Sequence, residues 1–362
     1  MGIRGIPFLQ YILRLMWGNN RHLNRFERKY IALHEQSGEA YWYYKFRKIH
    51  PELDLDQSDP KKLRLILGIG RSGTTWIGRM LATSMTPLRY FEEPLHHIIP
   101  ALSFTNGYNH TAIRFWKALS DSHRLVLSYK LFALPNYDWS KLGIQPFLKR
   151  DDKNFNFCLV KEVHSLLATE ALLDKFQVPT IIVIRDPVHI VDSLFNAQSL
   201  STLYLTDEVK MILQDPIFFR RYLSKASDKV RSTFAKIASW PGGRRKAVQQ
   251  RILIVSIMTK MLECVAKNSE MVHLVRYEEL CLSPGKCFSD MAAFLGLDWT
   301  KSNVDALLDT TNYKGEVTSP YSIKRNTAQQ IERSFRVLTP AELEEAKEIL
   351  KYCKLGYSSN AC

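Results

Sequence analysis

Short apolar runs alternate along the chain with stretches whose apolar positions recur at helical spacing. The runs are typical of buried strands and cover residues 63–69, 87–93, 156–162, 180–186 and 271–280. The stretches with helical spacing cover residues 74–84, 165–176, 187–198 and 284–297. Strands that alternate with helices predict an α/β fold, with a central parallel sheet of about five strands and helices on both faces. Ligands of such sheets bind beyond the carboxyl ends of the strands, so polar residues at those ends are the first candidates for a site.

A glycine-rich segment, GIGRSGTTW at residues 68–76, joins the first predicted strand to its helix. Gly68 and Gly73 have the spacing of a phosphate-binding loop, but Thr74 stands where nucleotide hydrolases have a lysine. Such a loop points backbone N–H groups and a helix N-terminus at an anion. The missing lysine normally reaches the terminal phosphates of a triphosphate. Its absence indicates a nucleotide with a different charged end.

A second polar cluster follows the fourth predicted strand, in the sequence IRDPVHIVDS. Arg185 ends the strand, and Ser193 lies two turns into the following helix. Asp186 and Pro187 are typical of a helix N-cap and a first helical residue, which is a structural role. An arginine at a strand end suits the forked recognition of a phosphate. An isolated arginine of this kind is more often part of a surface ion pair.

The two clusters together resemble the sulfotransferase family, whose sulfonate donor is 3′-phosphoadenosine 5′-phosphosulfate. The resemblance rests on the loop without lysine and on the Arg-Asp-Pro strand end with a serine eight residues after the arginine. Residues 274–297 and 322–357 resemble the C-terminal part of Golgi-type carbohydrate sulfotransferases, the galactose and N-acetylglucosamine 6-O branch. That branch has a Ser-Arg-Asn-Ser-like turn before a Trp-Arg pair, whereas here the turn is Lys-Arg-Asn-Thr and Phe335 replaces the tryptophan. The resemblance covers roughly residues 63–357.

The resemblance implies a fold like that of P-loop-containing nucleoside triphosphate hydrolases, and it assigns the donor site. It implies that the 5′-phosphosulfate is held by Arg71, Ser72, Gly73, Thr74 and Thr75. It places the 3′-phosphate at Arg185 and Ser193, with Arg325 closing the site. Trp76 either stacks on or near the adenine or is a core residue of its helix.

No metal is expected in this chemistry. Arginine, lysine and backbone N–H groups can neutralise a phosphosulfate, which carries fewer charges than a triphosphate with magnesium. No predicted strand resembles the Walker-B strand whose acidic end holds magnesium in a nucleotide hydrolase.

The acceptor side of the site requires a general base and a group that stabilises the leaving oxygen. Glu93, after the second strand, resembles the acidic residue of Golgi-type enzymes, and Glu92 is the competing choice. Lys161 matches a lysine that many family members carry after the third strand, where its ammonium would stabilise developing charge together with Arg71. His164 is a second candidate base, but it lies three residues after that lysine, whereas cytosolic family members place their histidine two residues after it.

Length and composition fit one large domain with additions. The chain has 362 residues, of which 46% are hydrophobic and 24% are charged. We predict a basic helical N-terminal extension at residues 1–60 and a sulfotransferase domain at residues 61–362. Insertions on the acceptor side of that domain are expected at about residues 95–155 and 200–268.

The net charge of +14 is concentrated in two segments. Residues 1–50 contain nine Lys and Arg against three Glu, and residues 220–260 contain eleven against one Asp. Such clusters indicate anionic partners, among them an anionic membrane surface or an acidic glycan; the alternative is a solvated helix face. The favoured acceptor is a carbohydrate or a glycolipid, and a lipid or small-molecule hydroxyl is the alternative.

Two rival functions use the same features. A P-loop kinase would share the loop, but Thr74 in the lysine position argues against it. A nucleic-acid-binding protein would use the basic segments, but the sequence has no recognition-helix motif and no zinc-ligand spacing, so no nucleic-acid partner is expected.

The sequence also bears on the cellular location. No apolar run reaches the ~20 residues that a transmembrane helix needs, and the best candidate, IPFLQYILRLMW, contains Arg14. Six cysteines at irregular spacing indicate neither a zinc site nor a disulfide framework. We expect a cytoplasmic protein, with possible peripheral contact to a membrane, similar to a bacterial member of the family.

Overall fold

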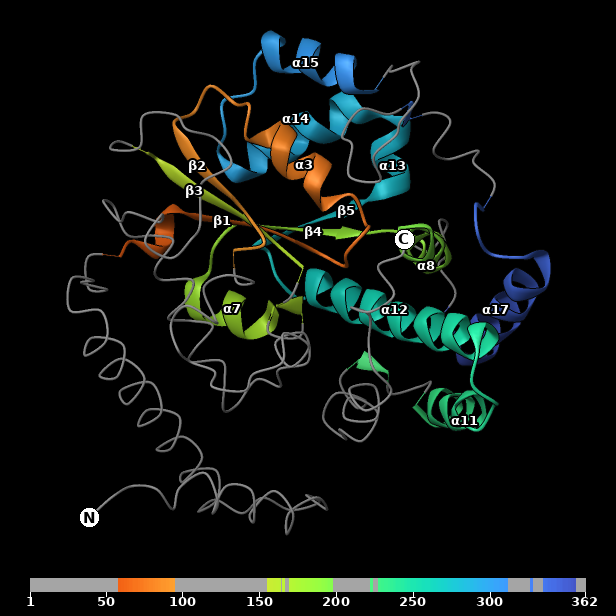
Figure 1. Ribbon diagram of the computed structural model, residues 1–362. Helices are drawn as coiled ribbons and strands as arrows, with labels where there is room; N and C mark the ends of the chain where they lie inside the picture. Colours follow the sequence, from red (N-terminus) through yellow and green to blue (C-terminus); the bar gives the residue numbers. More distant parts are fainter. Residues whose placement is uncertain are drawn as a thin grey trace, which may run out of the picture.

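The computed structural model describes residues 58–94, 155–163, 165–166, 169–197, 222–223, 227–311, 326–327 and 335–355 (Figure 1). These residues form a five-stranded sheet in the order β2-β3-β1-β4-β5, and every neighbouring pair is parallel. The strands are β1 (Leu63–Gly68), β2 (Leu88–Glu92), β3 (Phe157–Glu162), β4 (Thr180–Ile184) and β5 (Val272–Arg276). A short 3₁₀-helix, η3 (Pro60–Lys62), leads into β1. The predicted α/β fold is therefore confirmed.

Helices cover both faces of the sheet (Figure 1). One face packs against α3 (Thr74–Leu81), α13 (Tyr277–Leu282), α14 (Pro284–Leu295) and α15 (Lys301–Thr311). On the other side of the sheet, one hydrophobic core is shared by that face, α7 (Thr169–Phe176), α8 (Pro187–Asn196), α11 (Ser227–Ala238), α12 (Arg244–Lys267) and α17 (Pro340–Cys353). Helices α11 and α17 contact α12. Because both faces are buried, the central strands are nearly continuous apolar runs rather than alternating ones, as parallel sheets require. All five residues of β4 are buried.

Helix α12 is a core element of this fold. Every residue from Ile252 to Thr259 is buried, which is the pattern of a helix surrounded by protein on all sides. The helix contacts α8, α11 and α17 as well as strands β4 and β5. Residues 244–267 belong to the segment expected to form an insertion on the acceptor side, and in the structure they complete the core beneath the sheet.

Most predicted elements appear close to their expected boundaries. The clearest difference is at the fifth strand, predicted over residues 271–280, which ends at Arg276 and continues as the short helix α13. Within the described part of the chain, no helix is both long and apolar enough to cross a bilayer. The predicted N-terminal extension and the predicted insertion at residues 95–155 lie almost entirely outside the described residues.

Candidate active site

The segment between β1 and α3 is a tightly curled loop. Arg71 and Gly73 have left-handed backbones, with φ of 74° and 99°, and the Ser72 N–H donates to the Ile69 carbonyl at 3.0 Å. A Cβ atom at Gly73 would lie 2.6 Å from the ring of Tyr277, so the position requires glycine for both its φ and its space. A Cβ atom at Gly68 would lie 2.7 Å from the Ser72 hydroxyl oxygen. The two glycines therefore allow the loop to fold over the end of the sheet.

This loop presents the donors that an anion needs. Helix α3 begins without a side-chain cap at Gly73, and the N–H groups of its first turn have no acceptor within the helix. The Ser72 side chain is fully buried, and its hydroxyl has no hydrogen-bond partner among the described residues. A buried hydroxyl without a partner is unfavourable unless a ligand supplies one. The loop, the hydroxyl and the helix N-terminus thus fit a bound phosphate group.

Three of the predicted donor residues come together beside the loop. The Arg71 side chain donates from Nε to the Ser193 hydroxyl of α8 at 3.1 Å. Arg185, directly after β4, donates from Nη1 to the Arg71 carbonyl at 3.1 Å. No described carboxylate forms an ion pair with Arg185, so the alternative of an ordinary surface ion pair is not seen among the described residues. Two guanidinium groups and a hydroxyl from three separate elements therefore share one location at the carboxyl edge of the sheet.

Tyr277 supports this arrangement, and the sequence analysis did not single it out. The Arg185 guanidinium lies 4.4 Å from the centre of the Tyr277 ring, in a cation–π contact. The same ring lies directly under Gly73. Tyr277 directly follows β5, but the predicted strand extended to residue 280, so the strand end that would have indicated this residue was missed. Its ring fixes the loop and Arg185 relative to each other.

The start of α8 is fixed by its N-cap, as the sequence predicted. The Asp186 carboxylate accepts hydrogen bonds from the backbone N–H groups of Val188 and His189 at 2.8 and 3.1 Å. Burial alone would raise the pKa of Asp186, but the hydrogen bonds from His189 and Val188 outweigh it, and the pKa is lowered. The N–H of Asp186 itself donates to Glu278 of α13. These bonds hold the strand end that carries Arg185.

Trp76, expected either beside the adenine or in the core, is enclosed by other side chains. Its side chain is fully buried and makes edge contacts with Tyr277 and Phe288, with ring centres 6.5 and 5.3 Å apart. Its indole N–H donates to the Thr310 hydroxyl of α15 at 3.3 Å. An indole enclosed in this way presents no face to an adenine ring. The alternative interpretation, a core tryptophan of the helix, is the one that the structure shows.

The two residues predicted to perform the transfer are direct neighbours. The Lys161 ammonium forms an ion pair with the Glu93 carboxylate, and the Glu93 N–H donates to the Lys161 carbonyl at 2.7 Å. The Lys161 side chain is 3% exposed and that of Glu93 is 39% exposed, so the lysine is enclosed while the carboxylate reaches solvent. Glu93 has a left-handed backbone, with φ of 50°, directly after β2. Such a conformation in a non-glycine residue is uncommon and is concentrated at functional sites.

Glu92, the competing candidate for the base, is engaged elsewhere. Its two carboxylate oxygens accept hydrogen bonds from Arg79 of α3 at 2.6 and 3.1 Å. This bidentate pair raises the pKa of Arg79, mainly through the hydrogen bond. Glu92 thus joins β2 to α3, and Arg79 occupies both of its carboxylate oxygens. His164 and Arg325 lie outside the described residues.

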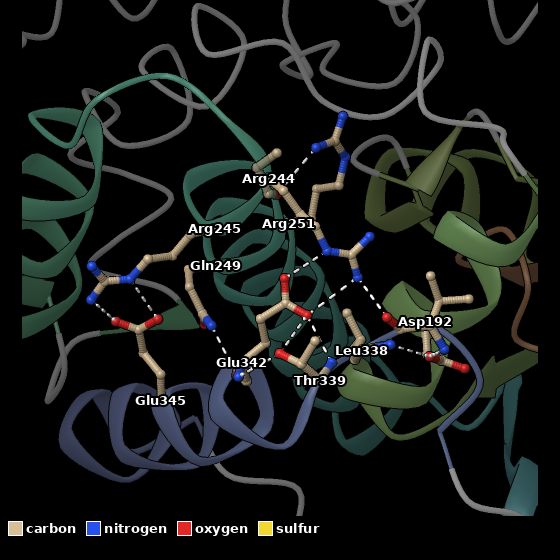
Figure 2. Close-up of polar contacts among 11 residues, drawn as sticks. Asp192, Arg244, Arg245, Gln249, Arg251, Leu338, Thr339, Glu342 and Glu345 are labelled. Atoms are coloured by element: carbon tan, nitrogen blue, oxygen red, sulfur yellow. Dashed lines mark hydrogen bonds and ion pairs between the residues drawn. The ribbon is translucent and has the colours of Figure 1, made fainter.

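Several arginines of the basic segment at residues 220–260 are occupied by contacts within the protein (Figure 2). Arg244 and Arg245, at the start of α12, form ion pairs with Glu342 and Glu345 of α17 at 2.8 and 2.6 Å. Lys246 donates to the carbonyls of the chain before α12. Part of the charge that suggested an external anion therefore joins α12 to its neighbours.

This chain has low sequence identity to the solved structures that resemble it. No curated protein sequence is significantly similar to this chain. Among solved structures, mouse sulfotransferase SULT7A1 complexed with PAP is 14% identical, with a TM-score of 0.37, and the alignment covers 83% of this chain and 86% of that chain. Sulfotransferase STF9 from Mycobacterium avium is 14% identical with a TM-score of 0.36, covering 92% of this chain and 86% of that chain. The sulfotransferase domain from the curacin biosynthetic pathway is 12% identical with a TM-score of 0.39, and the alignment covers 80% of this chain and 97% of that chain.

The family itself is given by the sequence model. The model of the sulfotransferase domain matches residues 62–351, which is most of the chain and includes every described strand. The parallel sheet with a phosphate loop after β1 is the P-loop-containing nucleoside triphosphate hydrolase-like fold that the resemblance implied. The chain belongs to the sulfotransferase family.

Proposed function

We propose that this protein transfers a sulfonate group from 3′-phosphoadenosine 5′-phosphosulfate to a hydroxyl of a carbohydrate or glycolipid. The observation that carries this proposal is the meeting of Arg71, Arg185 and Ser193 beside a phosphate loop that has threonine in place of lysine. These groups would neutralise the two charged ends of the donor without a divalent cation.

The donor would lie along the carboxyl edge of the sheet. The loop N–H groups and the buried Ser72 hydroxyl would hold the 5′-phosphosulfate, together with Thr74 and Thr75 at the start of α3. Arg185 and Ser193 would hold the 3′-phosphate. Arg71 donates to Ser193 and lies in the loop, so its side chain would span the two ends of the nucleotide. Arg325 would close the site, as the family resemblance implies.

The transfer would be an in-line displacement at sulfur. Glu93 accepts the proton of the acceptor hydroxyl, and the acceptor oxygen forms a bond to sulfur. The bond between sulfur and the bridging oxygen breaks, and adenosine 3′,5′-bisphosphate leaves with the electron pair. Lys161, held beside Glu93, stabilises the charge that develops on the bridging oxygen. A loose transition state of this kind asks the protein mainly for positioning and electrostatics. His164 is retained as the alternative base.

The carbohydrate acceptor is the least constrained part of the proposal. It is supported by the similarity of residues 274–297 and 322–357 to the C-terminal part of Golgi-type enzymes. The aromatic residues of the segment 100–155, which would suit sugar rings, lie outside the described residues. A lipid or small-molecule hydroxyl is the alternative acceptor. The cytoplasmic location and the contact with an anionic membrane also stay predictions.

The direct test is a transfer assay with ³⁵S-labelled donor against glycans, glycolipids and phenols. We expect label in at least one glycan or glycolipid, with adenosine 3′,5′-bisphosphate as the second product, and no change when a chelator is added. Label in phenols alone would overturn the carbohydrate assignment but keep the reaction. Donor binding without any transfer would mean that the acceptor is not in this panel, and a wider panel of acceptors would be assayed. A protein that does not bind the donor at all would overturn the proposed function.

A further inference from the structure

Asp192 lies in the middle of α8, where its side chain is almost completely buried. Aspartate is a poor helix former, and a buried carboxylate is costly unless it is hydrogen-bonded. The partners of Asp192 are the backbone N–H groups of Arg336, Val337 and Leu338, which donate to it at 2.9 to 3.1 Å. Figure 2 labels Asp192 and Leu338. Consecutive main-chain N–H groups that converge on one point form an anion-binding concavity. Here a carboxylate of the protein itself fills it.

The segment that Asp192 holds is attached to α8 and α12 at further points. The Phe335 ring packs on His189, with ring centres 4.6 Å apart. On the other side, Arg244 donates to the Val337 carbonyl at 2.6 Å and to both oxygens of Glu342. The segment 335–339, immediately before α17, is therefore fixed between α8 and α12. Helix α8 in turn has this segment as a rigid neighbour.

The next residue of α8 is Ser193, which accepts the hydrogen bond from Arg71 of the phosphate loop. Successive residues of an α-helix point in directions about 100° apart, because the helix has 3.6 residues per turn. Helix α8 thus contacts the C-terminal segment with one side chain and the phosphate loop with its neighbour. A rotation or shift of α8 that loosens the Asp192 contacts also moves the Ser193 hydroxyl away from Arg71.

We infer that Asp192 is a positioning residue for the donor nucleotide, because its hold on residues 336–338 sets α8 so that Ser193 meets Arg71. This inference rests on the proposed function, since it assigns Ser193 and Arg71 to the donor. It makes donor binding and the docking of the C-terminal segment two coupled events. Coupling between binding events is reciprocal, so the donor product must strengthen the same contacts that Asp192 provides.

The test combines calorimetry with amide hydrogen exchange, using adenosine 3′,5′-bisphosphate as the probe. In the full-length wild-type protein, the bisphosphate should slow exchange at the N–H groups of residues 336–338. Asp192→Asn keeps one acceptor oxygen and should weaken bisphosphate binding about fivefold, at the lower limit of typical coupling. Asp192→Ala leaves three buried N–H groups without an acceptor and should weaken binding further. In the transfer assay, Asp192→Asn should raise the donor KM more than it lowers kcat.

The matched control is Arg245→Ala, which removes a contact between α12 and α17 without touching α8. It should leave bisphosphate affinity at the wild-type value. If Asp192→Asn and Asp192→Ala bind the bisphosphate as tightly as wild type, or if the bisphosphate does not change exchange at residues 336–338, the inference is wrong while the proposed function stands. If Arg245→Ala weakens binding as much as Asp192→Asn, Asp192 acts only through stability, which also overturns the inference. A wild-type protein that does not bind the bisphosphate would overturn both.

Discussion

Two glycines of the phosphate loop, three residues apart, have very different surroundings. Gly73 has a φ of 99° and would place a Cβ atom 2.6 Å from the Tyr277 ring, whereas a Cβ atom at Gly70 would meet nothing within 4 Å. A left-handed backbone alone costs a residue with a side chain about 1–2 kcal/mol. Gly73→Ala should therefore lower the melting temperature and abolish binding of adenosine 3′,5′-bisphosphate. Gly70→Ala should melt like the wild type, and equal melting temperatures for the two variants would contradict this view of the loop.

Arg185 should contribute mainly to donor binding. It contacts the Arg71 carbonyl and the Tyr277 ring, at some distance along the sheet edge from the Glu93–Lys161 pair. A hydrogen bond to a charged group is worth about 1.5–3 kcal/mol, so Arg185→Ala should weaken bisphosphate binding roughly 10- to 100-fold by calorimetry. Turnover at saturating donor should fall much less. The exposed Lys286→Ala, on α14, is the control. A larger loss in kcat than in affinity would contradict the assignment of Arg185 to the 3′-phosphate.

Glu93 and Glu92 offer a matched test of the general base. Glu93→Gln removes the proposed proton acceptor and should lower kcat by about 10²-fold or more, with bisphosphate affinity close to wild type. Glu92→Gln breaks the bidentate contact with Arg79, which joins β2 to α3, so it should lower the melting temperature more than the turnover. Near-normal turnover in Glu93→Gln would show that Glu93 is not the base and would favour His164 in that role. The comparison is sharp because the two residues are adjacent and the substitutions are identical.

For single residues, the sequence predicted that Arg71, Arg185 and Ser193 lie together at the edge of the sheet. It did not predict the role of every candidate residue. The position of Trp76 directly after the loop fits both an adenine contact and a core residue. Only the packing of Phe288 and Thr310 around it shows that it belongs to the core. Similarly, only the family resemblance favoured Glu93 over Glu92. Glu92 ends β2 and pairs with Arg79, whereas Glu93 follows the strand with a left-handed backbone and pairs with Lys161.

Among the elements, the contact between α12 and α17 has a predictable pH dependence. Burial alone would raise the pKa of Glu342, but hydrogen bonds from Arg244 and Thr339 outweigh it and lower the pKa from its ordinary value of 4.5. A carboxyl group with a lowered folded-state pKa stabilises the protein above its unfolded-state pKa and loses that effect as the pH falls through the folded-state pKa. The wild-type melting temperature should therefore drop as the pH falls below about 4.5.

Glu342→Gln isolates this effect. The variant should melt below the wild type at neutral pH, because Gln cannot form the ion pair with Arg244. The difference between the two proteins should shrink as the pH falls below the ordinary pKa of Glu, since the wild-type carboxylate is then protonated. Thermal melts at a series of pH values measure the difference. A difference in melting temperature that stays constant as the pH falls would contradict the role assigned to Glu342.

The same helices show where sequence patterns become ambiguous. Three of the six basic residues of α12 lie in its first turn, and apolar residues extend through the rest, so the segment has no clear apolar stripe. The charge suggested an anionic partner, whereas the arginines pair with acids of α17, almost a hundred positions along the chain. Pairings of such long sequence separation are set by the tertiary fold and leave no local signal. By contrast, Asp186 and Pro187 predicted the start of α8 correctly, because a cap is a local feature.

Over the whole molecule, the parallel arrangement of the strands explains why the sequence could predict which residues lie near one another at the candidate site. The described strands all run in the same direction, so residues that follow them meet at one edge. Strand periodicity therefore predicted that Arg71 and Arg185 lie close together, although they are 114 positions apart. Periodicity does not give the order of strands or the directions of side chains. The contact of Arg71 with Ser193 and the support from Tyr277 depend on both.

The most direct measurement is a calorimetric titration of the full-length protein with adenosine 3′,5′-bisphosphate, with and without a chelator, beside a titration with adenosine 5′-monophosphate. A site built from Arg71, Arg185, Ser193 and the loop N–H groups should bind the bisphosphate equally well in both buffers. It should bind the monophosphate much more weakly, since that nucleotide lacks the group assigned to Arg185 and Ser193. Equal affinity for the two nucleotides, or binding that requires magnesium, would contradict a metal-free site for a 3′-phosphorylated nucleotide.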